Sequence, residues 1–142
     1  MNINQPGAAG GSTRIIPDPD GKSSDGPGPM LLSAGTLTGE KVVNAANEDL
    51  GKIEEIMLDV PTGRIAYAVM SSGTILGMGG KLFAVPWQAL TLDVRNERFI
   101  LDVDKERLEK APGFNSDHWP SMADRQWATS IHSYYDRRPY WE

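Results

Sequence analysis

The 142-residue chain contains no cysteine, which excludes disulfide bonds, thiolate metal ligands and a cysteine nucleophile. It also has no long hydrophobic run: the longest uncharged stretch, residues 65–80, holds four glycines and is shorter than the roughly 20 apolar residues of a membrane span. Its 14 lysines and arginines are outnumbered by 19 carboxylates and form no cluster, so we expect no nucleic-acid partner. The N-terminus shows no basic segment followed by an apolar one. We therefore expect a cytoplasmic protein without membrane insertion.

The first 29 residues hold six glycines and five prolines and show no apolar periodicity. Such a segment cannot bury enough surface to offset the entropy cost of ordering it. We predict a disordered tail over residues 1–29. Asp18–Gly21 has some calcium-loop character, but no glutamate follows at the required spacing, so a flexible turn is the favoured interpretation.

The sequence pattern of residues 30–103 is typical of a small all-β domain. Short apolar runs bounded by turn residues predict strands at residues 41–44, 51–60, 64–71, 81–86, 90–94 and 99–103. About six short strands favour a small closed barrel, because closure removes the exposed edges of an open sheet. Within the second strand the apolar alternation changes phase across Glu54-Glu55, which predicts a β-bulge at that point.

The chain beyond residue 103 is predicted to be helical and aromatic. Asp104 is placed to cap a short helix that ends at Lys110, before Pro112-Gly113. A second helix is predicted over 122–135, with capping-box spacing across 121–124 and an apolar side chain at every fourth position. Seven of the eleven aromatic residues lie in residues 114–142. The candidate interaction surface of this region comprises Trp119, Trp127, Ile131, Tyr134, Tyr135 and Trp141.

Two interpretations of this aromatic stripe are open. It either packs within the protein's own fold, on its own barrel or that of a twin subunit, or it docks onto another chain, since tryptophan and tyrosine are favoured at interface centres.

The remaining motifs predict no catalytic, cofactor-binding or metal site. The glycine-rich loop at residues 77–81 lacks the P-loop spacing and precedes a strand. His132 and Asp136 have helical i, i+4 spacing, but two ligands do not make a zinc site. Glu54 and Glu55 are adjacent on a strand, where neighbouring side chains point to opposite faces.

Several connected segments are similar to the PRC-barrel domain of bacterial stand-alone type, named after the photosynthetic reaction centre. The similarity covers roughly residues 32–141 and rests on residues 41–44, 48–53, 62–69, 76–81, 84–87, 101–103 and 111–114, followed by 118–124 and 132–135. It implies a mainly β fold: a closed barrel of about six strands with a short helix and a C-terminal helix carrying the aromatic stripe. The resulting boundaries are a tail at 1–29, a barrel at 32–114 and a helical extension at 115–142.

The resemblance implies a mode of action more than a reaction. Related barrels occur in the H subunit of purple bacterial reaction centres, near the quinones, and in a ribosome-maturation factor that binds a ribosomal protein. We therefore expect a non-catalytic protein-binding or scaffold domain without cofactors, whose partner is another protein or a second copy in a homodimer. The alternative is a peripheral accessory of a membrane electron-transfer or photosynthetic complex.

Overall fold

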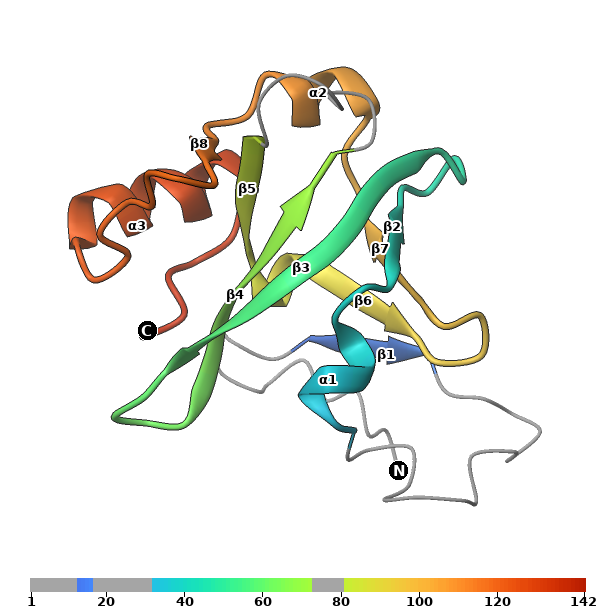
Figure 1. Cartoon of the computed structure of the whole chain (residues 1–142), viewed down its shortest axis with the longest axis horizontal. Coiled ribbons are helices and arrows are strands. Elements are labelled where there is room, and N and C mark those ends of the chain that lie inside the picture. Colours follow the sequence, from blue (N-terminus) through green and yellow to red (C-terminus); the bar gives the residue numbers. More distant parts are fainter. Residues whose placement is uncertain (1–12, 17–31, 73–80) are drawn as a thin grey trace.

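The computed structural model describes residues 13–16, 32–72 and 81–142 (Figure 1). Over these residues the fold is mainly β, with eight strands in one sheet and three α-helices. The strands are β1 (Arg14–Ile16), β2 (Lys41–Val43), β3 (Asp49–Asp59), β4 (Arg64–Ser71), β5 (Lys81–Pro86), β6 (Leu90–Asp93), β7 (Arg98–Leu101) and β8 (Phe114–Asn115). The helices are α1 (Ala34–Leu37), α2 (Lys105–Glu109), α3 (Arg125–Tyr134) and the 3₁₀ turn η3 (Trp87–Ala89).

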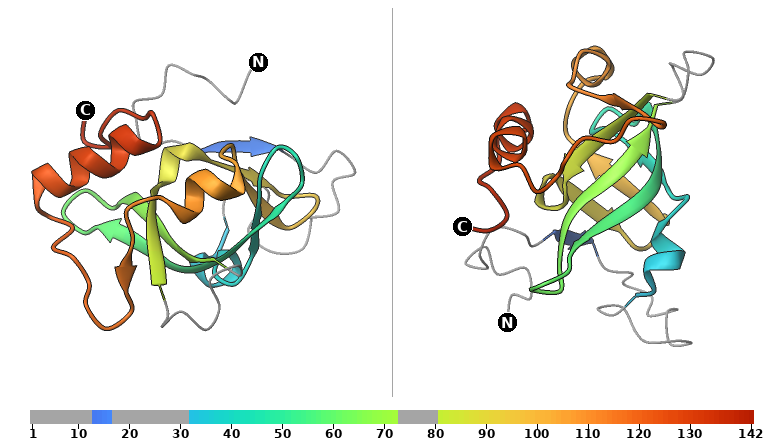
Figure 2. Two further views of the ribbon diagram at one scale, coloured as in Figure 1. Left: turned by 90° about the horizontal axis from the view of Figure 1, so that it is seen from above. Right: turned by 60° about the vertical axis from the view of Figure 1, so that its left-hand side comes forward.

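The sheet has the strand order β1-β6-β7-β2-β3-β4-β5-β8. β1 pairs parallel with β6 and β2 pairs parallel with β7, while the other neighbours are antiparallel. Figure 2 shows the sheet curving around the core, with α3 beside one end of it. Within the described residues no ladder joins the end strands β1 and β8, so the predicted closure of the barrel is not confirmed.

All six predicted strands are present, and two further strands were not predicted. β8 is only two residues long, and β1 falls inside the segment expected to be a disordered tail. That expectation is corrected at residues 14–16, because an existing sheet edge on β6 supplies main-chain partners that the local sequence does not reveal. Residues 1–12 and 17–29 of the predicted tail, and residues 77–80 of the glycine-rich loop, lie outside the described residues.

The predicted bulge in β3 is confirmed. β3 pairs with β4 as Ile53↔Met70 and then Glu55↔Val69, which leaves Glu54 as the extra residue. The hydroxyl of Ser71 donates to Oε2 of Glu54 at 2.6 Å and holds the bulge from the neighbouring strand. The extra residue absorbs the phase change and lets both ends of a long strand follow the curved core.

The starts of α2 and α3 are set by aspartates. Asp104 caps α2 as predicted, its carboxylate accepting from the Arg107 amide at 2.7 Å. The expected start of the last helix near Met122 is wrong: Asp124 is the cap and α3 begins at Arg125. The Asp124 carboxylate accepts the amide of Gln126 at 2.9 Å, so it satisfies the first free N–H groups of the helix.

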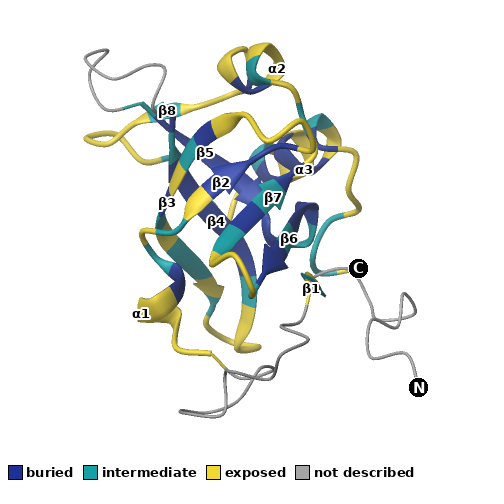
Figure 3. Cartoon of the chain, turned by 90° about the vertical axis from the view of Figure 1, so that its right-hand side faces the viewer, coloured by how far each residue is buried: buried dark blue, intermediate teal, exposed yellow. Residues whose placement is uncertain are grey.

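The core fills the inside of the curved sheet and continues between the sheet and α3. Figure 3 shows buried residues following β2, β4, β5 and β7, while much of α1 and α2 is exposed. β4 and β5 are buried over most of their lengths because α3 covers them in addition to the sheet's own interior. The largest fully buried side chains include Tyr67, Phe83 and Phe99.

Candidate functional site

The aromatic helix packs on the chain's own sheet through Tyr67 of β4. The Tyr67 ring meets Trp127 edge-on at a centroid distance of 5.5 Å and meets His132 at 5.3 Å. Tyr140, from the segment after α3, approaches the same ring at 5.9 Å. Such edge-to-face contacts add to the apolar burial and orient α3 on β4 and β5.

His132 is fully buried at the centre of this cluster. Its Nδ1 lies 2.7 Å from the carbonyl oxygen of Ala128 and therefore carries the proton and donates. Its Nε2 accepts the backbone N–H of Tyr140 at 3.2 Å and therefore has no proton. Burial lowers the pKa of His132, while the Ala128 hydrogen bond and the charge of Glu142 oppose that shift. The neutral imidazole thus joins α3 to the C-terminal segment. Among the described residues its hydrogen-bond partners are Ala128 and Tyr140, and Asp136 is not one of them.

The structure distributes the predicted interaction residues over very different environments. Ile131 and Tyr135 are buried against the chain's own fold and offer no surface to a partner. Trp127, Tyr134 and Trp141 are half-buried, and Trp119 is 41% exposed. Trp119 packs on Phe114 of β8 at a centroid distance of 5.0 Å. The interpretation that the stripe packs within its own fold therefore holds for α3, and the six residues do not form one exposed face.

The most exposed large apolar side chains lie at the far end of the β3–β4 hairpin. Leu58 is 58% exposed and Val60 is 82% exposed. Pro61 follows in the turn and is also exposed. We call these three residues the hairpin tip; Figure 1 shows the hairpin extending beyond the neighbouring strands.

The turn of the hairpin is held in place by polar contacts. The Thr62 hydroxyl donates to Oδ2 of Asp59 at 2.6 Å across the turn. Nη1 of Arg64 donates to the carbonyl oxygen of Tyr140 at 2.6 Å, which ties the start of β4 to the C-terminal segment. The hairpin tip is thus carried on a turn with a defined shape.

The titratable groups elsewhere are dispersed. Burial raises the pKa of Glu40 to about 7, with a smaller contribution from the negative charge of Glu97. Glu54, considered above as half of a carboxylate pair, accepts from Ser71 at the bulge. Among residues 13–16, 32–72 and 81–142, no group of three His, Asp or Glu side chains is placed to hold a metal ion.

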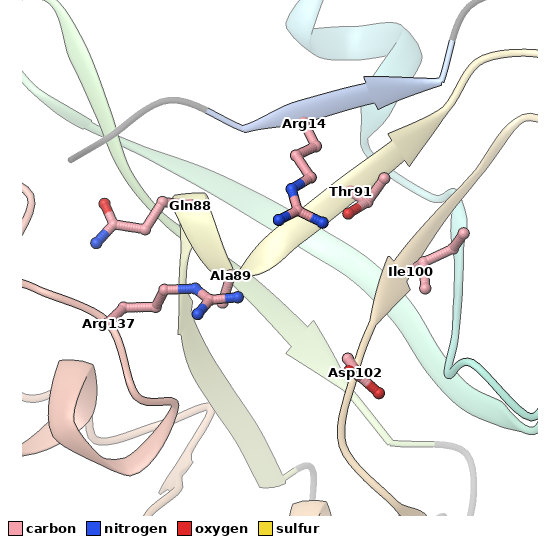
Figure 4. Close-up of a pocket in the computed structure, with 7 residues that line it drawn as sticks. All are labelled: Arg14, Gln88, Ala89, Thr91, Ile100, Asp102 and Arg137. Carbon is pink, nitrogen blue, oxygen red and sulfur yellow. The ribbon is translucent and has the colours of Figure 1, made fainter. Parts of the chain in front are cut away.

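A polar pocket of about 200 Å³ lies where β1, η3, β6 and β7 approach the C-terminal segment (Figure 4). Figure 4 shows Arg14 entering it from β1 and Arg137 from the segment after α3. It is lined by Arg14, Gln88, Ala89, Thr91, Ile100, Asp102 and Arg137.

The exposure of the hairpin tip was not predicted from the sequence. Ile56, Leu58 and Val60 alternate, which is the pattern of a core-facing strand. The only available signal was that Val60 directly precedes the turn at Pro61, where a strand can extend past its neighbours.

Comparison with known proteins agrees with the architecture. The family model for the PRC-barrel domain matches residues 31–108, which is more than half of the chain. No curated protein matches the chain significantly. Over the residues that the structure describes, no helix has both the length and the apolar character needed to cross a membrane. The family match and the mainly β fold together place this chain in the PRC-barrel domain family.

Proposed function

We propose that this protein is a non-catalytic docking domain that binds another protein through its hairpin tip. The PRC-barrel domain is known as a protein-interaction module. The single observation that carries the proposal is the 82% exposure of Val60 beside the 58% exposure of Leu58. Adjacent exposed aliphatic side chains at one projecting site are typical of an interaction surface, because contact with a partner removes their apolar area from water.

The anchored turn of the hairpin supports the same proposal. The Thr62–Asp59 and Arg64–Tyr140 hydrogen bonds restrict the turn before any partner arrives. A pre-organised surface loses less conformational entropy on binding, so a small apolar contact contributes more to affinity.

The exposed part of the aromatic region is a second candidate contact. Trp119 is its most accessible member, with Trp127, Tyr134 and Trp141 contributing only partial surface. Because Trp119 lies next to β8, a partner that contacts it would cover a different part of the molecule from the hairpin tip.

The partner is another protein or a second copy of this chain, in a cytoplasmic setting and without a cofactor. A membrane electron-transfer complex is the alternative partner that the resemblance to the reaction-centre H subunit implies. Both classes are tested by incubating the purified full-length chain with soluble and membrane fractions of the native cell.

The decisive comparison is between Val60→Lys and Thr129→Lys. Both variants add one positive charge at an exposed position, but Thr129 lies on α3, away from the hairpin tip. We expect Thr129→Lys to retain whatever the wild-type chain captures and Val60→Lys to lose it, with unchanged thermal unfolding for both. Equal capture by the two variants would refute the hairpin tip as the docking surface.

A further inference from the structure

The outer edge of β6 is covered by a segment from far away in the sequence. β1 lies parallel to β6 with Arg14 opposite Thr91 and Ile16 opposite Asp93. The amide of Val94 donates to the carbonyl oxygen of Ile16 at 3.1 Å. Figure 1 shows β1 at this end of the sheet, beside β6. Residues 14–16 of the chain are therefore added as a strand to the edge of β6.

A side-chain hydroxyl fixes the first position of this added segment. Oγ1 of Thr13 lies 2.8 Å from the carbonyl oxygen of Trp87 and 2.5 Å from that of Leu90. Trp87 is the first residue of η3 and Leu90 follows its last, so the single hydroxyl proton has two carbonyl acceptors at that turn, of which the Trp87 carbonyl also accepts the N–H of Leu90. Any segment lacking a hydroxyl at this position would leave these acceptors without that donor.

The main-chain ladder itself depends little on side-chain identity. Arg14 is exposed, Ile16 is 42% exposed and Ile15 is only half-buried. A main-chain ladder of this kind forms with any extended segment, and a strand of three residues with little buried area is easily replaced.

We propose that the edge of β6 is a docking site for an extended segment of a partner protein, and that residues 13–16 occupy it until the partner displaces them. The partner segment adds parallel to β6 and carries serine or threonine at the position of Thr13. This site is separate from the hairpin tip, and the proposal for β6 does not depend on the function proposed above.

The polar pocket specifies the second position of the partner segment. Arg14 points from β1 into the space lined by Thr91, Asp102 and Arg137 (Figure 4). Because both a carboxylate and a guanidinium line this space, a polar side chain suits it better than an aliphatic one. The third position, that of half-buried Ile15, takes an aliphatic residue.

The test uses a fluorescent peptide with the sequence of residues 11–18 and the full-length chain. The carbonyl oxygen of Ile16 accepts a hydrogen bond from the N–H of Val94, so the backbone N–H of Ile16 also faces the neighbouring strand. Ile16→Pro removes this N–H donor and releases the chain's own strand from β6. Ile15→Pro is the matched control, because the Ile15 N–H faces away from the ladder, where proline is tolerated. We expect anisotropy to show about tenfold or more tighter peptide binding by Ile16→Pro than by wild type or Ile15→Pro, because the tethered competitor is gone.

Peptide variants test the chemistry of recognition. A peptide with Ile16→Pro should not bind, and one with Thr13→Val should bind more weakly than the parent peptide. Equal binding by all three chains, or binding by none of them while circular dichroism shows them folded, would overturn the proposal. If Ile16→Pro does not fold, Thr13→Val in the chain serves as the releasing variant. A concentration-dependent wild-type dimer that Ile16→Pro abolishes would also overturn it, because residues 13–16 of a second copy would then be the occupant.

Discussion

Nε2 of buried His132 accepts the backbone N–H of Tyr140 at 3.2 Å, so one neutral imidazole joins α3 to the C-terminal segment. Protonation of Nε2 would place two N–H groups face to face and break this link. His132 also packs on Tyr67, so it stabilises the contact between α3 and the sheet as well.

The buried imidazole of His132 makes the free energy of unfolding depend on pH. Burial holds the pKa of His132 below its ordinary value of 6.5, so in mildly acidic solution the unfolded chain binds more protons than the folded chain. The contribution of His132 to the free energy of unfolding should be fully retained above pH 6.5 and should be lost as the pH drops from there toward the lower folded pKa. Glu40, whose pKa is raised to about 7, stabilises the folded chain as the pH falls through the same range, so the His132 contribution is measured as the difference between variants. Thermal unfolding between pH 8 and pH 5 measures this, with exposed His118→Gln as the control that keeps the full pH dependence and His132→Gln as the variant that weakens it. The same slope in both variants would show that His132 is not the titrating group.

Trp127 is predicted to stabilise the folded chain. Because Trp127 packs edge-on to Tyr67 but is only half-buried, Trp127→Ala should lower the free energy of unfolding by about 2–4 kcal/mol. Exposed Trp119→Ala should cost about 1 kcal/mol or less. Denaturant unfolding beside sizing chromatography checks both variants. A Trp127→Ala chain of unchanged stability that loses a dimer would instead assign the stripe to a subunit interface.

Gly51 is predicted to be irreplaceable. It has φ +137°, and a Cβ at this position would lie 1.8 Å from the carbonyl oxygen of Ser71. Gly51→Ala must therefore push β3 away from β4 and should destabilise the fold by about 4 kcal/mol or more. Gly63 also has a positive φ, of 76°, but open space around it, so Gly63→Ala should cost only about 1–2 kcal/mol. Similar melting temperatures for the two variants would contradict this account.

The bulge predicts an unusual pattern of deletion tolerance. Removing Glu54 takes out the unpaired residue and leaves the pairs Ile53↔Met70 and Glu55↔Val69 in register, at a cost of about 1–2 kcal/mol from lost curvature and the lost Ser71 hydrogen bond. Removing Ile56 shifts paired residues to the wrong face and should cost about 4 kcal/mol or prevent folding. Chemical denaturation of both deletion variants measures the difference. Equal losses would mean that Glu54 is not a true bulge residue.

Local signals in the sequence were sufficient for most of the fold. Alternation and turn residues predicted β2 to β7, and the phase change at Glu54-Glu55 revealed the bulge because both effects act within a few residues. β1 could not be predicted this way. Its three residues sit in a glycine- and proline-rich context, and their partners on β6 lie more than 70 residues away.

The candidate site was harder to predict than the fold. The spacing of Trp127 and Ile131 correctly indicated a packed helix face, but spacing alone does not distinguish the chain's own sheet from another protein. Val60 presented the opposite difficulty. Its alternation with Leu58 indicated burial, and only the tertiary structure shows that the neighbouring strands end before they cover it.

The most direct test of the account places a photo-crosslinking amino acid at Val60 of the full-length chain in the native cell. A matched chain carries it at exposed Glu109 on α2. We expect a discrete crosslinked protein species from position 60 that is absent from position 109. Crosslinks that are absent at position 60, or the same at both positions, would contradict docking through the hairpin tip.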